Sequence, residues 1–246
     1  MAITALSALG PLRVWSLLVT VFGDLAPDRP LDGPTLSALM SGIGIKPEAT
    51  RVALHRLRAD GWITSQKQGR ISQHSLTPKG RQDSIGARPR IYGRPGDENA
   101  TARFALMPDT ASELNPTKFT TIAPRIYICA SDTPLPEHAL SLIPQSLPNW
   151  IGAQIESKNL RAGYAALHDV LQTIDRNRDA IGTLNPQETA VLRVMIVHAW
   201  RRLALKHPVL PRSAHTSLWC GHDCRSLVTT LLDRYPRPDP EQLGAT

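Results

Sequence analysis

The chain has 246 residues, of which 41% are hydrophobic, and 28 Lys and Arg residues against 21 Asp and Glu residues give it a formal charge of +7. This composition excludes global disorder, predicts two or three domains, and favours a polyanionic partner, with nucleic acid ahead of an anionic membrane. Three cysteines are too few for a disulfide framework and suit a reducing cytoplasm. The apolar run VWSLLVTVF, residues 14–22, is too short to span a bilayer and predicts a buried helix.

The first 86 residues predict three helices followed by a hairpin. Apolar spacing and helix-end signals place the helices from Gly10-Pro11 to about Phe22, from Pro34 to Met40 with Asp32 or Gly33 as the cap, and from Pro47 to about Asp60. Alternating residues predict strands over 62–66 and 73–77, joined by a tip at 67–72. Three helices and a two-stranded hairpin in this order are typical of a winged helix-turn-helix.

The rest of the chain predicts two further units. A Pro- and Gly-rich stretch over 87–100 indicates a linker. Short strands over 102–107, 125–129 and 150–155, with a short helix over 136–143, predict a small α+β domain that ends at residue 156. Helical periodicity dominates residues 157–246, including a helix opened by the cap Asn185-Pro186 and running to about Lys206. The predicted fold class is therefore α+β, with domains at 1–86, 87–156 and 157–246.

The third helix has two different faces. Ala49, Val52, Ala53 and Leu57 are expected to point inward, while Arg51, His55 and Arg58 recur on another face, flanked by Thr50. An α-helix fits the major groove, where Arg can bind guanine and Thr can meet a thymine methyl group or a phosphate. The hairpin tip carries Lys67, Arg70 and Ser72, which could reach backbone phosphates or the minor groove beside them. The alternative is that the charged face of this helix is merely solvated.

Several segments resemble a known family when taken in order. VWSLLVTVFGD, TRVALHRLRADGWITS, QGRISQHSLTPKG and RIYG, followed by VHAWRRLALKHPVLPRSAHTSLWCG near the C-terminus, resemble the PaaX-like family of bacterial transcriptional repressors. The family usually has Thr after the arginine of the recognition helix and an aromatic residue where this chain has His55, whereas Val52 follows Arg51 here. In the hairpin, Ile71 and Gln73 also depart from the usual pattern. These departures bear on the operator sequence and leave the DNA-binding role standing.

The resemblance implies a three-part cytoplasmic regulator: a winged helix, a ferredoxin-like α+β centre, and a helical domain for effector binding or dimerisation. It further implies a homodimeric repressor of a phenylacetate-type catabolic operon, which binds double-stranded operator DNA. An acyl-coenzyme A effector such as phenylacetyl-coenzyme A is expected to release it. The same kind of regulator answering a different acyl ester is the nearest alternative. No cofactor and no membrane partner are expected.

The C-terminal helix 186–206 supplies candidate effector-binding residues. His198, Arg201 and Arg202 are neighbours on its surface, and Lys206 follows one turn later. Arginine is a common anion clamp and could hold the phosphates of coenzyme A, while Trp219 and Trp200 could line a slot for the acyl group. The alternative is that these arginines pair with acidic residues and the tryptophans fill the core.

Two patterns raise the possibility of other chemistry. Cys220, His222 and Cys224 invite a zinc interpretation, although structural zinc sites usually have four ligands, and a helix start with semi-buried thiols is the alternative. Asp109 follows a predicted strand, and the centre of the family resembles a CRISPR-associated nuclease subunit in which such an Asp helps bind metal. No second carboxylate or His stands at a useful spacing in the sequence. A nuclease or a thioesterase-like enzyme is therefore the runner-up, and we expect a regulator rather than an enzyme.

Overall fold

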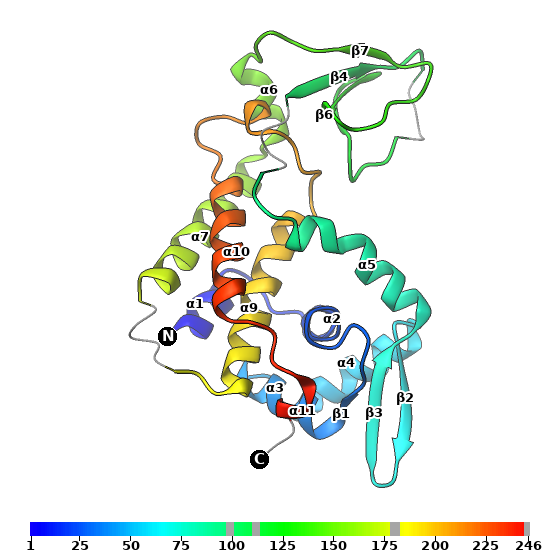
Figure 1. Ribbon diagram of the computed structural model, residues 1–246, viewed down its shortest axis with the longest axis vertical. Helices are drawn as coiled ribbons and strands as arrows, with labels where there is room; N and C mark the ends of the chain where they lie inside the picture. The colour runs from blue at the N-terminus through cyan, green and yellow to red at the C-terminus, as the bar shows by residue number, and fades with distance from the viewer. Residues whose placement is uncertain (97–100, 110–113, 178–182, 244–246) are drawn as a thin grey trace.

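The computed structural model describes residues 1–96, 101–109, 114–177 and 183–243. Most of these residues lie in a helical part that carries a protruding hairpin, and a small sheet lies at the opposite end of the molecule (Figure 1). The helices are α1 Ala2–Ala8, α2 Val14–Leu25, α3 Gly33–Gly42, α4 Pro47–Ala59, α5 Pro78–Tyr92, α6 Asn149–Ile155, α7 Lys158–Arg176, α9 Pro186–Ala204, α10 Gly221–Arg234 and α11 Pro240–Leu243. The strands are β1 Leu31–Asp32, β2 Ile63–Gln68, β3 Ile71–Leu76, β4 Ala102–Leu106, β5 Thr120–Ala123, β6 Ile126–Ala130 and β7 Leu140–Leu142.

The N-terminal elements follow the predicted order. Helix α3 begins where the Asp32 carboxylate accepts the backbone N–H of Thr35 at 2.6 Å, so the predicted cap is confirmed. Helix α4 begins at Pro47 and ends before Gly61, whose φ of 69° lies in the left-handed region. Strands β2 and β3 pair antiparallel, and β1 adds a third strand beside β3, which the sequence analysis did not predict.

Two predictions near the N-terminus need correction, and one helix there was not predicted. Helix α2 begins at Val14 rather than at Gly10-Pro11, because Arg13 still has an extended backbone. The short helix α1 was not predicted. Residues 87–92 belong to α5 rather than to a linker: the buried Ile91 and a 2.9 Å hydrogen bond from the Trp200 indole to the Ile91 carbonyl hold the last turn despite Pro89. Residues 97–100 of the predicted linker lie outside the described residues.

The central unit is a four-stranded antiparallel sheet with strand order β5-β6-β4-β7. Two predictions were wrong here. The predicted helix 136–143 contains strand β7 instead, which pairs with β4, and the predicted strand 150–155 is helix α6, whose Ile151 and Ile155 face the sheet at helical spacing. A ferredoxin-like unit alternates its strands with two helices, whereas α6 is the one helix among the described residues of this unit. A small α+β unit is thus confirmed, and its ferredoxin-like form is not.

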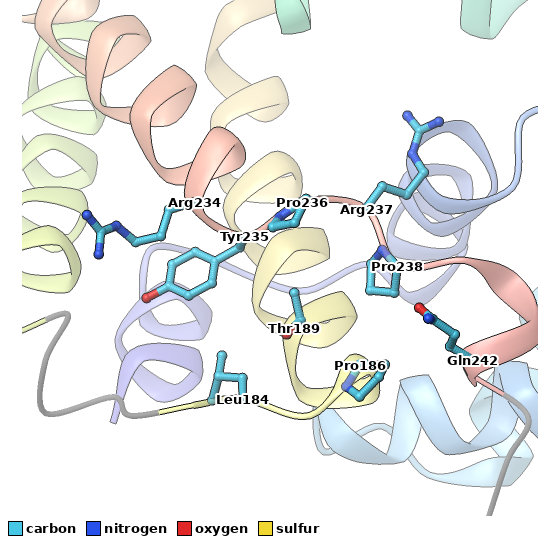
Figure 2. A pocket seen from close by; sticks show the side chains of 9 residues that line it. All are labelled: Leu184, Pro186, Thr189, Arg234, Tyr235, Pro236, Arg237, Pro238 and Gln242. Atoms are coloured by element: carbon cyan, nitrogen blue, oxygen red, sulfur yellow. The ribbon is translucent and has the colours of Figure 1, made fainter.

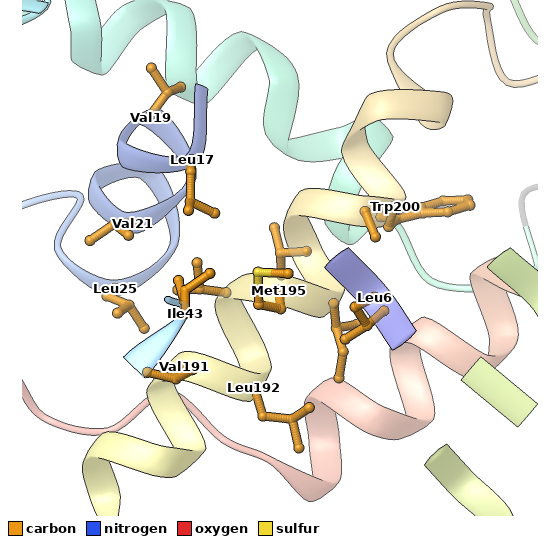
Figure 3. Close-up of a cluster of buried hydrophobic side chains, with 14 of the residues drawn as sticks. Leu6, Leu17, Val19, Val21, Leu25, Ile43, Val191, Leu192, Met195 and Trp200 are labelled. Atoms are coloured by element: carbon orange, nitrogen blue, oxygen red, sulfur yellow. The ribbon is translucent and has the colours of Figure 1, made fainter. Parts of the chain in front are cut away.

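One hydrophobic core joins the two ends of the sequence. Leu17 and Phe22 of α2, Leu57 of α4, and Met195 and Trp200 of α9 all belong to a single cluster of buried side chains. Figure 3 shows side chains of α2 and α9 facing this cluster together with Leu6 of α1. The three-domain division stays a prediction, and the first and last of the predicted domains share this core.

A buried ion pair crosses the same junction. The Asp24 carboxylate of α2 accepts two hydrogen bonds from the Arg193 guanidinium of α9, at 2.7 and 3.1 Å, and a third from the Tyr92 hydroxyl of α5 at 2.9 Å. The same guanidinium donates to the carbonyls of Leu232 and Tyr235 at 3.0 and 2.9 Å. Burial, followed by the charge of Asp24, raises the pKa of Tyr92 far above its ordinary value, so its hydroxyl remains a donor. One network therefore links α2, α5, α9 and the end of α10.

Within the described residues, no helix has the length and apolar character needed to cross a membrane.

Candidate nucleic-acid interface and C-terminal residues

The outer face of α4 presents cationic side chains. Arg51, His55 and Arg58 are exposed, while Ala53 and Leu57 bury the opposite face in the core shared with α2. Arg51 Nη2 lies 2.9 Å from Glu48 Oε1, and both side chains are largely exposed. An exposed pair of this kind contributes little free energy, so Arg51 can exchange it for a base or a phosphate.

The buried face of α4 differs from the predicted one at two residues, Thr50 and Val52. Thr50, predicted to flank the DNA face, is only 3% exposed and directs its hydroxyl to the Lys46 carbonyl, whereas Val52, predicted to point inward, is 71% exposed. The buried stripe is Thr50, Ala53 and Leu57, which recur three and four residues apart. Because valine is apolar, the sequence analysis wrongly assigned Val52 to the core. Val52 therefore belongs to the exposed face together with Arg51 and His55.

The hairpin is longer and tighter than predicted. Strands β2 and β3 include Lys67 and Ser72, which pair across the hairpin, and the turn is reduced to Gly69-Arg70, with Gly69 at a φ of 63°. Lys67 and Arg70 are exposed, and Ser72 is half-buried. The two cations therefore lie at the far end of a projecting hairpin (Figure 1).

Hydrogen bonds fix the base of this hairpin. Thr77 Oγ1 donates to the Gly61 carbonyl at 2.6 Å, and so joins the end of β3 to the end of α4. Ser65 and the buried His74 pair across the strands at 2.8 Å. Burial and then the charge of Arg58 lower the pKa of His74, so this histidine is neutral at physiological pH. These hydrogen bonds join the hairpin to the end of α4 and hold its two strands together.

Two of the candidate effector residues instead join α9 to α2. His198 is 1% exposed, and its Nδ1 lies 3.1 Å from the Thr20 hydroxyl. Arg201 donates to the Ser16 carbonyl and to Thr20 Oγ1 at 3.2 and 3.0 Å. Burial, followed by the charge of Arg201, lowers the pKa of His198 to about 4, so the ring is neutral at pH 7. The two side chains therefore already have partners within the helix pair.

The other two candidates lie elsewhere. Trp219 is buried, stacks on His215 with ring centroids 4.5 Å apart, and meets the edge of Tyr164. Arg202 is half-buried beside Gly10, where a Cβ would come within 2.5 Å of its guanidinium. The structure does not bring His198, Arg201, Arg202 and Trp219 together in one pocket. Both tryptophans, Trp200 and Trp219, fill the core, as the alternative interpretation expected.

Arg201 nevertheless borders a small cavity. This space of about 180 Å³ lies between α2, α5 and α9, and Val19, Trp62, Ile91 and Val197 supply much of its apolar wall. Trp62 lies between α4 and β2, so the cavity adjoins α4 and the hairpin directly.

A different hollow of about 410 Å³ lies beside the start of α9. Figure 2 shows the side chains of Arg234 and Arg237 projecting in different directions from it rather than converging. The first turn of α9 is already closed by a capping box, in which Asn185 and Glu188 satisfy each other's backbone N–H groups. This hollow therefore offers no obvious anion site.

The cysteines behave as packed thiols. Cys224 is buried and directs its thiol to the Tyr164 carbonyl, and burial strongly raises its pKa. Across the part of the chain that the structure describes, no cluster of three or more His, Cys, Asp or Glu side chains is arranged to hold a metal ion. Asp109 is exposed just beyond β4.

Comparisons with known proteins identify the family of this chain. Residues 13–80 match the family model described as PaaX-like protein, and residues 155–241 match the PaaX-like protein C-terminal domain. The chain belongs to the PaaX-like family. It is 25% identical to the transcriptional repressor PaaX of Escherichia coli K12, across 91% of this chain and 81% of that protein. Its fold resembles that of the uncharacterized protein Rv0674 from Mycobacterium tuberculosis, with a TM-score of 0.54 and 15% identity, across 93% of this chain and 96% of that one.

The exposed position of Arg51 in this PaaX-like chain leads to a first prediction. Replacing Arg51 with Ala should weaken binding to promoter DNA by about 1–3 kcal/mol and relax the choice of base at one position, because a bidentate contact to a base is lost. The measurement is fluorescence anisotropy on the chain's own promoter and on single-base variants of it. Arg176→Ala, at an exposed arginine on α7, is the matched control and should bind as the wild type does. Wild-type affinity in Arg51→Ala would contradict this interface.

A second prediction concerns the hairpin. Lys67→Ala and Arg70→Ala should each weaken binding to promoter and random DNA alike, because phosphate contacts do not depend on sequence. Each substitution should lower the slope of log K against log salt concentration by about 1. Titrations at four or more salt concentrations measure this slope, with Lys158→Ala as a control on the distant helix α7. An unchanged slope in both variants would place the hairpin away from DNA.

Proposed function

We propose that the chain is a DNA-binding transcriptional repressor whose first 86 residues form a winged helix-turn-helix. The observation that carries this proposal is the exposed Arg51, Val52 and His55 face of α4, fixed beside a hairpin with Lys67 and Arg70 near its end. Membership of the PaaX-like family, which includes a protein named as a transcriptional repressor, supports it. The chain is accordingly a regulator rather than an enzyme, and it is expected to act in the cytoplasm.

The proposed repressor binds DNA as a homodimer. Helix-turn-helix proteins commonly bind two half-sites, with one recognition helix in each of two successive major grooves. A symmetric pair of chains would present α4 and its hairpin twice, at a spacing set by the dimer. A ligand that changes this spacing would release the DNA without touching α4 itself.

The proposed effector is an acyl-coenzyme A ester of the phenylacetyl type, so that the chain represses an operon for aromatic-acid catabolism. The cavity between α2, α5 and α9 supports the aromatic part of this proposal. Its volume of about 180 Å³ is sufficient for one ring, since apolar cavities of about 150 Å³ bind benzene. Its walls come both from the core that carries α4 and from α9, so an occupant would contact both.

An effector shifts a protein between two states only as far as it binds one state more tightly. Trp62 and Val197 both line the cavity, so a movement of α9 relative to α4 and the hairpin would change its shape. We therefore expect the ester to select a form in which the two recognition helices of the dimer no longer fit successive grooves.

The test is an electrophoretic mobility shift on the chain's own promoter with phenylacetyl-coenzyme A, phenylacetate, free coenzyme A and a straight-chain acyl-coenzyme A. The expected result is specific binding, undone by phenylacetyl-coenzyme A at concentrations at which the other three have little effect. Release by the straight-chain ester alone would contradict the aromatic assignment. An absence of specific binding to the promoter under all conditions would contradict the repressor itself.

A further inference from the structure

A basic pocket lies at the end of α5, where the helical part meets the four-stranded sheet. Its volume is about 430 Å³, and its walls come from the last turns of α5, from segments flanking the sheet strands and from α10. Four cationic side chains line it, together with one carboxylate, that of Asp132: Arg90, Arg94, Lys118 and Arg225. Sequence reasoning missed this group because its members come from parts of the chain up to 135 residues apart.

Two of the arginines are held in place before any ligand arrives. Arg90 Nη2 donates to the carbonyls of Ala204 and His207 at 3.1 and 2.8 Å, while its Nε is buried without a hydrogen-bond partner. Arg225 is 8% exposed, donates to the Gly93 carbonyl at 3.1 Å, and places its guanidinium over the Trp200 ring. Fixed guanidinium groups lose little conformational entropy when they bind an anion.

The electrostatics of this pair favour a negative occupant. Burial lowers the pKa of Arg90, and the charge of Arg225 lowers it further. An anion bound beside Arg90 would offset both of these effects on its guanidinium, because it favours the charged form. Arg94 and Lys118 are exposed and add positive charge, and Arg94 makes only a long, exposed ion pair with Asp233, at 3.8 Å, which contributes little free energy.

We propose that this pocket binds the phosphate groups of a small nucleotide-class ligand, coenzyme A esters included. The inference rests on the proposed function, since it locates the charged end of the effector away from Arg201 and Arg202. Arginine pairs with phosphate oxygens in bidentate fashion, and the volume accommodates a diphosphate with adjoining groups.

Helix α5 connects this pocket to the DNA-facing hairpin. It begins immediately after β3, where Thr77 caps the helix and also binds the Gly61 carbonyl at the end of α4. At Gly80 a Cβ would lie only 2.2 Å from the Trp62 carbonyl, so glycine permits a close approach there. Fourteen residues after Thr77, Ile91 and then Gly93 bring the same helix to Trp200 and Arg225. A phosphate ligand that binds Arg90 could therefore displace α5, and the first residues of α5 are attached to the hairpin and to the end of α4.

The test is isothermal titration calorimetry of the full chain with pyrophosphate, ADP and coenzyme A as separate probes. Wild type should bind ADP or coenzyme A, and the Arg94→Glu/Lys118→Glu double variant should bind at least tenfold more weakly. These two cations are exposed, so the substitutions should leave the fold intact, which a melting curve checks. Lys158→Glu, which makes the same change of charge on α7, should bind as wild type does. Equal binding in the double variant and in wild type, or no binding of any probe, would overturn the proposal.

The three probes also separate the possible ligands. Tighter binding of coenzyme A than of ADP supports a coenzyme A ester, and equal binding of the two supports a nucleotide. Promoter binding is measured on the same samples without ligand. A wild-type chain that binds its promoter but none of the probes refutes the pocket and leaves the repressor standing, whereas one that binds a probe but not DNA refutes the repressor.

Discussion

The buried pair between Asp24 and Arg193 constrains the rest of the molecule. Both side chains are removed from water, and each has its hydrogen-bonding groups directed to the other or to neighbouring groups on α5 and α10. Removing one partner of such a pair leaves an uncompensated charge in the core, which typically costs about 3–5 kcal/mol. An alignment of α2 and α9 that separated Asp24 from Arg193 would incur this cost, so the pair favours the alignment seen in the structure.

This alignment has consequences for DNA binding. Helix α4 packs on α2 through the shared core, and the hairpin is attached to α4 through Thr77 and Gly61. Contacts between His198, Arg201 and Thr20 hold the same two helices a turn further along. The proposed DNA-binding surface of α4 and the hairpin thus shares its core with the C-terminal helices. A movement of α9 or α5 would therefore be transmitted to α4 through direct packing and hydrogen bonds.

Local signals in the sequence predicted the elements that depend on neighbouring residues. Asp32 before Pro34, Pro47 and Gly61 defined α3 and α4, and the Asn185 capping box defined the start of α9. Elements decided by distant contacts were predicted less well. The last turn of α5 depends on Trp200, more than a hundred residues away, and β7 depends on pairing with β4, so neither had a local signal. The strand prediction at 150–155 missed the four-residue spacing of Ile151 and Ile155.

The candidate site residues show the same difference between features set by local sequence and features set by distant contacts. Exposed charge on one face of a helix can be read from the sequence, and Arg51, His55, Arg58, Lys67 and Arg70 are all exposed. Whether a cation in an apolar segment faces a ligand or the core cannot be read in this way, because it depends on the helix packed against it. Arg201 and His198 face α2, whereas Arg90 and Arg225 line a basic pocket, although Arg90 entered the sequence comparison only as part of the segment RIYG and Arg225 was in no quoted segment.

Hydrogen exchange measured by mass spectrometry tests most directly whether the N-terminal helices, including α4, and the C-terminal helices form one cooperative unit. In wild type, peptides from α4 and from α9 should open with the same free energy, and Asp24→Asn should lower both values together by about 3–5 kcal/mol. Asp28→Asn, which removes the exposed partner of Arg81, is the control and should change both by less than about 1 kcal/mol. Loss of protection in α9 alone, with α4 unchanged in Asp24→Asn, would contradict a shared unit.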